Sequence, residues 1–139
     1  EPGLLHEDEL WFPLTIVTSQ KVIVNDKAFY CNRCNRKGSI ANTPNIERIY
    51  DKIYIAQSLE NLAENKKLAD CEGALKLRSA QIMVNVIKNL NVYNDSQLNA
   101  KAKESLYLLK QAPKLKYRML FYMCCVLGVN SVSKLLNRA

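Results

Sequence analysis

Two cysteines at a spacing suited to metal binding are the residues of this sequence with the clearest chemistry. Cys31 and Cys34 are separated by two residues, and Gly38 follows shortly after. Two thiolates at this spacing can converge on one Zn²⁺ ion, but they supply only half of a tetrahedral set. The alternative is a pair of reduced thiols in a tight turn, and the sequence leaves both interpretations open.

The surroundings of the two cysteines strengthen the metal interpretation. The run Ala28–Tyr30 favours a short strand, so the segment resembles a zinc knuckle in its strand, its spacing and its trailing glycine. This resemblance implies a structural zinc ion. We take His6 and Cys71 as the remaining ligands, because the adjacent Cys124 and Cys125 lie within an apolar run.

The second group of candidate residues is cationic. Residues 1–100 carry 12 Lys and Arg and 12 Asp and Glu, so the net charge of +7 lies in the last 39 residues, where Glu104 is the only acid. Such a local excess favours a polyanion or an acidic protein. The predicted nucleic-acid-binding residues are Lys101, Lys103, Lys110, Lys114, Lys116, Arg118, Lys134 and Arg138.

Two tyrosines lie among these cations. Tyr107 and Tyr117 flank the turn predicted near Pro113, where an aromatic ring beside phosphate-binding cations can stack on an unpaired base. The alternative is a solvated basic surface.

Catalytic residues are scarce. His6 is the only histidine, and most acids lie at predicted helix starts or on polar helix faces. The sequence contains no glycine-rich phosphate loop, nucleophile elbow or paired carboxylate motif. We therefore expect a protein that is not an enzyme.

The elements that position these residues divide the chain near residue 42. Leu14–Thr18, Val22–Val24 and Ala28–Tyr30 are short β-branched or aromatic runs, and Asn25-Asp26 suits a hairpin turn. Residues 1–42 are therefore predicted to form a small β-hairpin and knuckle element. The aromatic pair Trp11-Phe12 precedes the first strand and is interpreted as a core plug, with an exposed anchor for a partner as the alternative.

Residues 43–139 show helical periodicity. Thr43 and Pro44 predict the start of a helix that ends near Ala69, and a central helix follows from Asp70 to Leu90. Further helices are expected from Ser96 to Gln111, over 115–127 and over 132–137, with Asn130 or Ser131 as the last cap. The fold class is therefore mainly α, a bundle of about five helices in a single domain.

The end of the bundle contains two further patterns. Met119–Leu127 is too short for a membrane span and is expected to be a buried helix. Residues 127–137 resemble the turn and recognition helix of helix-turn-helix repressors, but the stretch from Gly128 to Val132 is about two residues shorter than that pattern requires. We interpret it as one helix ended by glycine and a second, capped helix.

Composition completes the sequence-based hypothesis. Five cysteines, an odd number with one adjacent pair, favour a reducing compartment, nuclear or cytoplasmic. We expect a non-enzymatic nucleic-acid-binding module of a larger intracellular assembly. The alternative is a protein-interaction or scaffold module that docks an acidic or apolar partner, and no membrane is involved.

Overall fold

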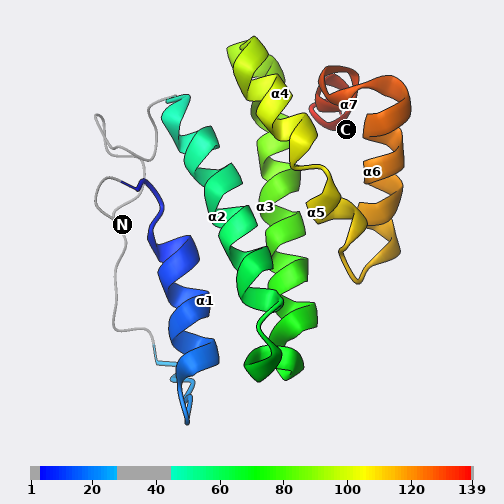
Figure 1. Ribbon diagram of the computed structural model, residues 1–139. Helices are drawn as coiled ribbons and strands as arrows, with labels where there is room; N and C mark the ends of the chain where they lie inside the picture. The colour runs from blue at the N-terminus through cyan, green and yellow to red at the C-terminus, as the bar shows by residue number, and fades with distance from the viewer. Residues whose placement is uncertain (1–3, 28–44, 139) are drawn as a thin grey trace.

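The computed structural model describes residues 4–27 and 45–138, and its regular elements there are all helical (Figure 1). The α-helices are α1 (Asp8–Thr18), α2 (Glu47–Ala63), α3 (Glu72–Tyr93), α4 (Ser96–Glu104), α5 (Tyr107–Lys110), α6 (Leu115–Leu127) and α7 (Val129–Leu136), and a 3-10 helix, η2 (Lys66–Cys71), joins α2 to α3. The prediction of a mainly helical bundle is confirmed for these residues.

The predicted N-terminal hairpin is wrong where it can be checked. Leu14–Thr18 forms the second half of α1, and residues 19–27 contain no strand. The hydroxyls of Thr15 and Thr18 donate to the carbonyls of Trp11 and Leu14, at 2.9 and 2.8 Å. Threonine can bond to the preceding helical turn in this way, so a β-branched run is compatible with a helix. The third predicted strand, Ala28–Tyr30, lies outside the described residues.

The α2–α3 connection also differs from the prediction. The predicted helix through Ala69 ends at Ala63, because the side chain of Asn65 accepts a bond from Lys67 N at 3.1 Å and starts a separate 3-10 turn. The central helix then begins at Glu72 rather than at Asp70. Thr43 and Pro44 lie outside the described residues, and Asn45 Oδ1 accepts from the Glu47 amide at 2.8 Å at the start of α2.

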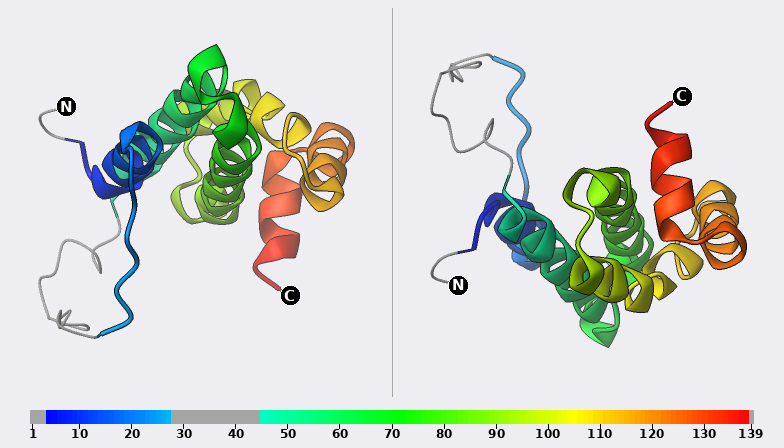
Figure 2. Two further views of the ribbon diagram at one scale, coloured as in Figure 1. Left: turned by 90° about the horizontal axis from the view of Figure 1, so that it is seen from below. Right: turned by 90° about the horizontal axis from the view of Figure 1, so that it is seen from above.

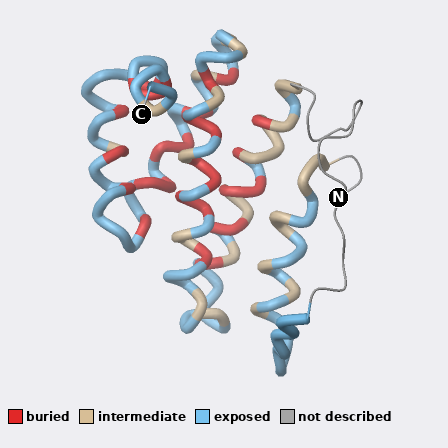
Figure 3. Tube along the Cα trace, turned by 180° about the vertical axis from the view of Figure 1, so that it is seen from behind, coloured by how far each residue is buried: buried red, intermediate tan, exposed pale blue. Residues whose placement is uncertain are grey.

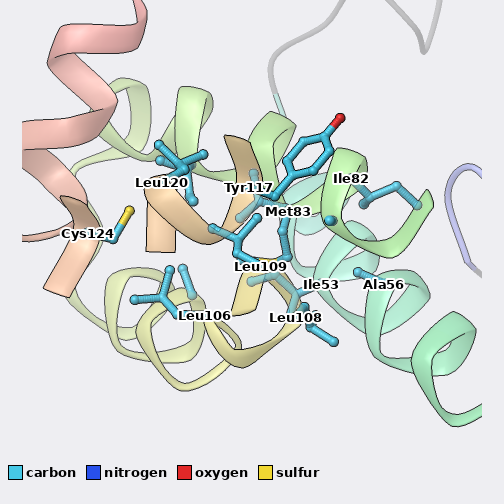
Figure 4. Close-up of a cluster of buried hydrophobic side chains, with 14 of the residues drawn as sticks. Ile53, Ala56, Ile82, Met83, Leu106, Leu108, Leu109, Tyr117, Leu120 and Cys124 are labelled. Atoms are coloured by element: carbon cyan, nitrogen blue, oxygen red, sulfur yellow. The ribbon is translucent and has the colours of Figure 1, made fainter. Parts of the chain in front are cut away.

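Helix α3 is the central helix, as the sequence predicts. It packs against α2, α4, α5 and α7, and its residues from Leu75 to Leu90 contribute to one continuous apolar core. Figure 4 shows Ile53 of α2, Met83 of α3 and Leu109 of α5 within this core. The buried hydroxyl of Ser79 donates to the carbonyl of Ala56 at 2.8 Å, which joins α2 to α3.

The helix predicted over 96–111 is divided into α4 and α5. The break falls at Ser105, whose hydroxyl donates to Lys101 O at 2.9 Å and accepts from the Gln57 amide at 3.0 Å. Asp95, rather than Ser96, caps α4: its Oδ1 accepts from Leu98 N at 2.6 Å.

The two C-terminal helices lie beyond α5. Helix α6 covers 115–127 as predicted and ends at Gly128, where φ is +80° and ψ is 148°. Helix α7 begins directly at Val129, so the predicted caps Asn130 and Ser131 lie inside it. Helix α7 packs against α3, and Asn137, the C-cap residue that follows α7, donates to Lys88 O at 2.7 Å.

The helices form a curved row with α1 at one end and α6 at the other (Figures 1 and 2). Helix α1 contacts α2 and contains no buried residue, which Figure 3 shows as a helix without red segments. The core therefore lies between α2 and α7, and among the described helices α1 and α6 have neighbours on one side only.

Candidate docking surface

The outward face of α6 carries an apolar stripe. Leu115, Met119, Tyr122 and Val126 recur at spacings of four, three and four residues, which places them on one face of a helix. Their exposed fractions are 62%, 58%, 60% and 82%. We call these four residues the α6 stripe. The opposite face buries Tyr117, Leu120 and Cys124, so the prediction that Met119–Leu127 is a buried helix holds for that face only.

A groove runs along the side of the stripe. It has a volume of about 510 Å³ and lies between α3, α6 and α7. Its apolar lining comes from Val84, Met119, Leu120, Met123 and Leu136, and Lys88 and Lys116 lie at its margin. Because methionine side chains are flexible and polarisable, this lining can adapt to an inserted side chain.

Cations border the stripe on both sides. At 100° per residue, Lys116 lies on one side of the stripe and Arg118 on the other, and both are exposed. Lys110 and Lys114 lie at the turn that leads into α6. The structure therefore brings four of the predicted binding residues to one end of the molecule, around an apolar face.

The other predicted cations are also exposed, but they lie elsewhere. Lys101 stands over the ring of Tyr50 at 5.3 Å, beside α2. Lys103 lies in the last turn of α4, Lys134 lies in α7, and Arg138 follows α7. The eight residues thus form one cluster of four and several separate charges.

The two tyrosines predicted to stack on bases differ in accessibility. Tyr117 is buried, with 8% of its surface exposed, while Tyr107 is 38% exposed. Burial raises the pKa of the Tyr107 hydroxyl, and the nearby Glu60 raises it further. Lys110 and Lys116 stand over the rings of Phe121 and Tyr117, at 5.9 and 5.0 Å. Of the pair, Tyr107 alone is therefore exposed.

The predicted zinc ligands are only partly described. Cys31 and Cys34 lie outside the described residues. His6 lies beside Arg48 in the first turn of α2, a helix of 17 residues. Cys71 is the last residue of η2, which follows the other end of α2. Because α2 is about 25 Å long, the structure does not bring His6 and Cys71 together. No group of three or more metal-binding side chains occurs within 4–27 and 45–138.

His6 is partly buried and bonds to α2. Its Nε2 accepts from Arg48 Nε at 3.0 Å and lies 2.8 Å from Arg48 Nη2. Burial lowers the pKa of His6, and the charge of Arg48 lowers it further. The neutral imidazole thus helps to join the start of α1 to α2, and the same is true of the Leu5 amide, which donates to Asp51 Oδ2 at 2.9 Å.

The two adjacent cysteines differ in reactivity. Burial raises the pKa of Cys124 to about 11, so its thiol stays protonated near neutral pH, whereas Cys125 is exposed. Since the thiolate is the metal-binding and nucleophilic form, Cys124 is suited to packing rather than to chemistry.

The sequence interpretation of Trp11-Phe12 as a core plug is wrong. These side chains are 63% and 60% exposed, which agrees with the alternative of an exposed anchor. They line a second apolar pocket of about 540 Å³ between α1 and the start of α3, together with Ile16, Ala74 and Leu75. The protein thus has a second apolar surface, at the end of the row opposite the α6 stripe.

The sequence shows two apolar faces on α6 but not which of them is exposed. The spacing from Leu115 to Val126 is helical, and so is the spacing of the buried residues from Tyr117 to Cys124. Lys116 and Arg118 border both faces, so the sequence alone does not distinguish the stripe from the buried side.

Comparison with known proteins finds no match among protein-family models, curated proteins or solved structures. Among the described helices, none has the length and apolar character needed to cross a bilayer.

Proposed function

We propose that this protein is an interaction module that binds an acidic, amphipathic helix of a protein partner on the α6 face. The observation that carries the proposal is the exposed α6 stripe with cations on both of its sides. Contiguous exposed apolar surface rimmed by polar residues is typical of protein-binding sites. An incoming helix would place its apolar residues on the stripe and its acids against Lys116 and Arg118.

The balance of apolar and charged groups favours a protein over a nucleic acid. Phosphate binding needs several cations but no apolar centre. Here the exposed side chains of α6 include Leu115, Met119 and Val126, which a phosphate backbone would leave in water. An amphipathic helix in a groove uses both the apolar centre and the charged rim.

Nucleic-acid binding is the second candidate function. Its support is the cluster Lys110, Lys114, Lys116 and Arg118, which is exposed and has Glu104 as the only acid of the surrounding sequence. Tyr107 lies beside this cluster in the chain and exposes part of its ring.

Binding measurements on two sets of variants distinguish the two functions. The probes are a labelled helical peptide with leucines on one face and glutamates beside them, a 20-nucleotide RNA and a 20-base-pair DNA. Met119→Ser with Met123→Ser removes apolar contacts and keeps every charge. Lys114→Glu with Lys116→Glu and Arg118→Glu reverses the rim.

Protein docking predicts that the methionine variant weakens peptide binding about tenfold or more, because each 1.4 kcal/mol of lost contact is a factor of ten. Nucleic-acid binding predicts that only the charge-reversed variant loses affinity, and that each lost phosphate contact lowers the salt slope by about one unit. Lys66→Glu with Lys67→Glu is the matched control, since these exposed lysines lie in η2. Equal peptide affinity of the methionine variant and the parent contradicts the proposal.

A further inference from the structure

The partner of the α6 face can be inferred from the opposite end of the molecule. Helix α1 leaves Trp11, Phe12 and Leu14 exposed, with exposed fractions of 63%, 60% and 42%. The exposed acids Glu7 and Asp8 lie at the start of the same face. Helix α1 is therefore an exposed apolar helix with an acidic end, which is the chemistry that the α6 face should bind.

The two surfaces match in size as well as in charge. Helix α1 has 11 residues and α6 has 13, so at 1.5 Å per residue their lengths are about 16 and 20 Å. Large aromatic side chains commonly anchor protein interfaces, and sulfur atoms make favourable contacts with aromatic rings. Trp11 and Phe12 thus suit a groove lined by Met119 and Met123, while Glu7 and Asp8 suit Lys88 and Lys116.

Within one molecule these surfaces lie far apart. Helix α1 packs on α2, and α2, α3 and α5 separate it from α6 in every view (Figures 1 and 2). The α6 face of one molecule can therefore receive α1 only from another molecule if α1 keeps its place on α2.

We infer that the protein associates head to tail, with α1 of one copy bound on the α6 face of the next. This inference rests on the proposed function and names its partner as a second copy of the chain. Because donor and acceptor are different surfaces at opposite ends, a head-to-tail contact is heterologous. A heterologous contact repeats from copy to copy and generates rings or open chains of molecules.

Complementation between two variants tests this arrangement. The donor variant, Trp11→Ala with Phe12→Ala, loses the donor surface on α1 and keeps the α6 face. The acceptor variant, Met119→Ser with Met123→Ser, loses the α6 face and keeps α1. Each is expected to be monomeric alone, since each lacks one surface. Mixed, they are expected to form one-to-one dimers, because each pair still contains one intact interface.

The chain contains a natural reporter of this contact. Trp11 is the only tryptophan, so the donor variant has none and all indole fluorescence in the mixture comes from the acceptor variant. Titration with the donor variant should shift the Trp11 emission to shorter wavelength as the indole leaves water. Light scattering after size exclusion measures the molecular mass in parallel. The control for loss of exposed apolar surface is Ile23→Ser with Val24→Ser, since these side chains are 79% and 89% exposed.

A parent protein whose mass rises with concentration, two monomeric variants and a dimeric mixture with shifted Trp11 emission would support head-to-tail association. A parent that stays monomeric, a variant that self-associates alone, or a mixture without dimer would overturn it. If the helical peptide still binds the α6 face in that case, the proposed function stands and only the identity of the partner is refuted.

Discussion

Glu60 of α2 is a buried carboxylate without adequate partners, and its replacement should stabilise the protein. Only 1% of Glu60 is exposed, and neither of its carboxylate oxygens accepts a hydrogen bond from the described residues. Lys76 Nζ lies 3.9 Å from Glu60 Oε1, but it bonds Glu72 Oε1 at 2.6 Å. The nearest cation is therefore oriented by a different acid.

Glu60→Met should raise the free energy of unfolding near neutral pH. A buried polar group without hydrogen bonds costs about 1–3 kcal/mol, and methionine fills a similar volume without that cost. For a domain of this size, each kcal/mol shifts the melting temperature by about 3–4 °C. The expected increase in melting temperature is thus about 3–12 °C at pH 7.5.

The stabilisation should depend on pH with a defined sign. Burial raises the pKa of Glu60, and the charge of Lys76 lowers it by less. The folded state therefore holds this proton more tightly than the unfolded chain, whose glutamate pKa is about 4.3. The favourable contribution is complete below that value and is lost as pH rises through the folded pKa. The advantage of the variant should consequently be smaller at pH 4.5 than at pH 7.5.

Thermal unfolding followed by circular dichroism at both pH values measures the effect. Glu64→Met is the matched control: Glu64 is an exposed acid one turn further along, and its replacement should change stability by less than about 0.5 kcal/mol. A Glu60→Met variant that is less stable than the parent at pH 7.5 would refute the reasoning, because the pair with Lys76 would then contribute more than burial costs.

Three further substitutions test other parts of the structure. Asp95→Ala should lower the free energy of unfolding in urea by about 1–2 kcal/mol, because Asp95 Oδ1 accepts from both Leu98 N and the Tyr50 hydroxyl. A loss below about 0.3 kcal/mol, which is less than a helix cap usually contributes, would contradict that role. Gly128→Ala should cost about 1–3 kcal/mol from backbone strain, since φ is +80° and the space around the glycine is open; an unchanged urea midpoint would argue against the strain. If Cys31 and Cys34 bind zinc, Cys31→Ser should release the ion and lower the melting temperature, and native mass spectrometry that finds less than about a tenth of an equivalent in the parent would remove the hypothesis.

The sequence by itself predicts the helical region well and the first part of the chain poorly. The structure reproduces two local signals of the sequence. One is the apolar periodicity of α3, and the other is the pair Pro113 and Gly128, which lie before the start and after the end of α6. The β-branched run Leu14–Thr18 misled the prediction, because strand preference is weak when threonine hydroxyls can bond to the preceding turn. The knuckle hypothesis stays a prediction, since Cys31 and Cys34 lie outside the described residues.

For the candidate site, the sequence determined the excess of cations, because charge is a property of composition and needs no fold. Only the tertiary structure decided which apolar residues these cations surround. The inner face of α6 is covered by α5 and α7, whereas no described helix covers the outer face, so Tyr117 is buried and Met119 is exposed only two residues away. Burial depends on neighbours that are distant in the sequence, and a hydrophobic run does not reveal on which side those neighbours lie.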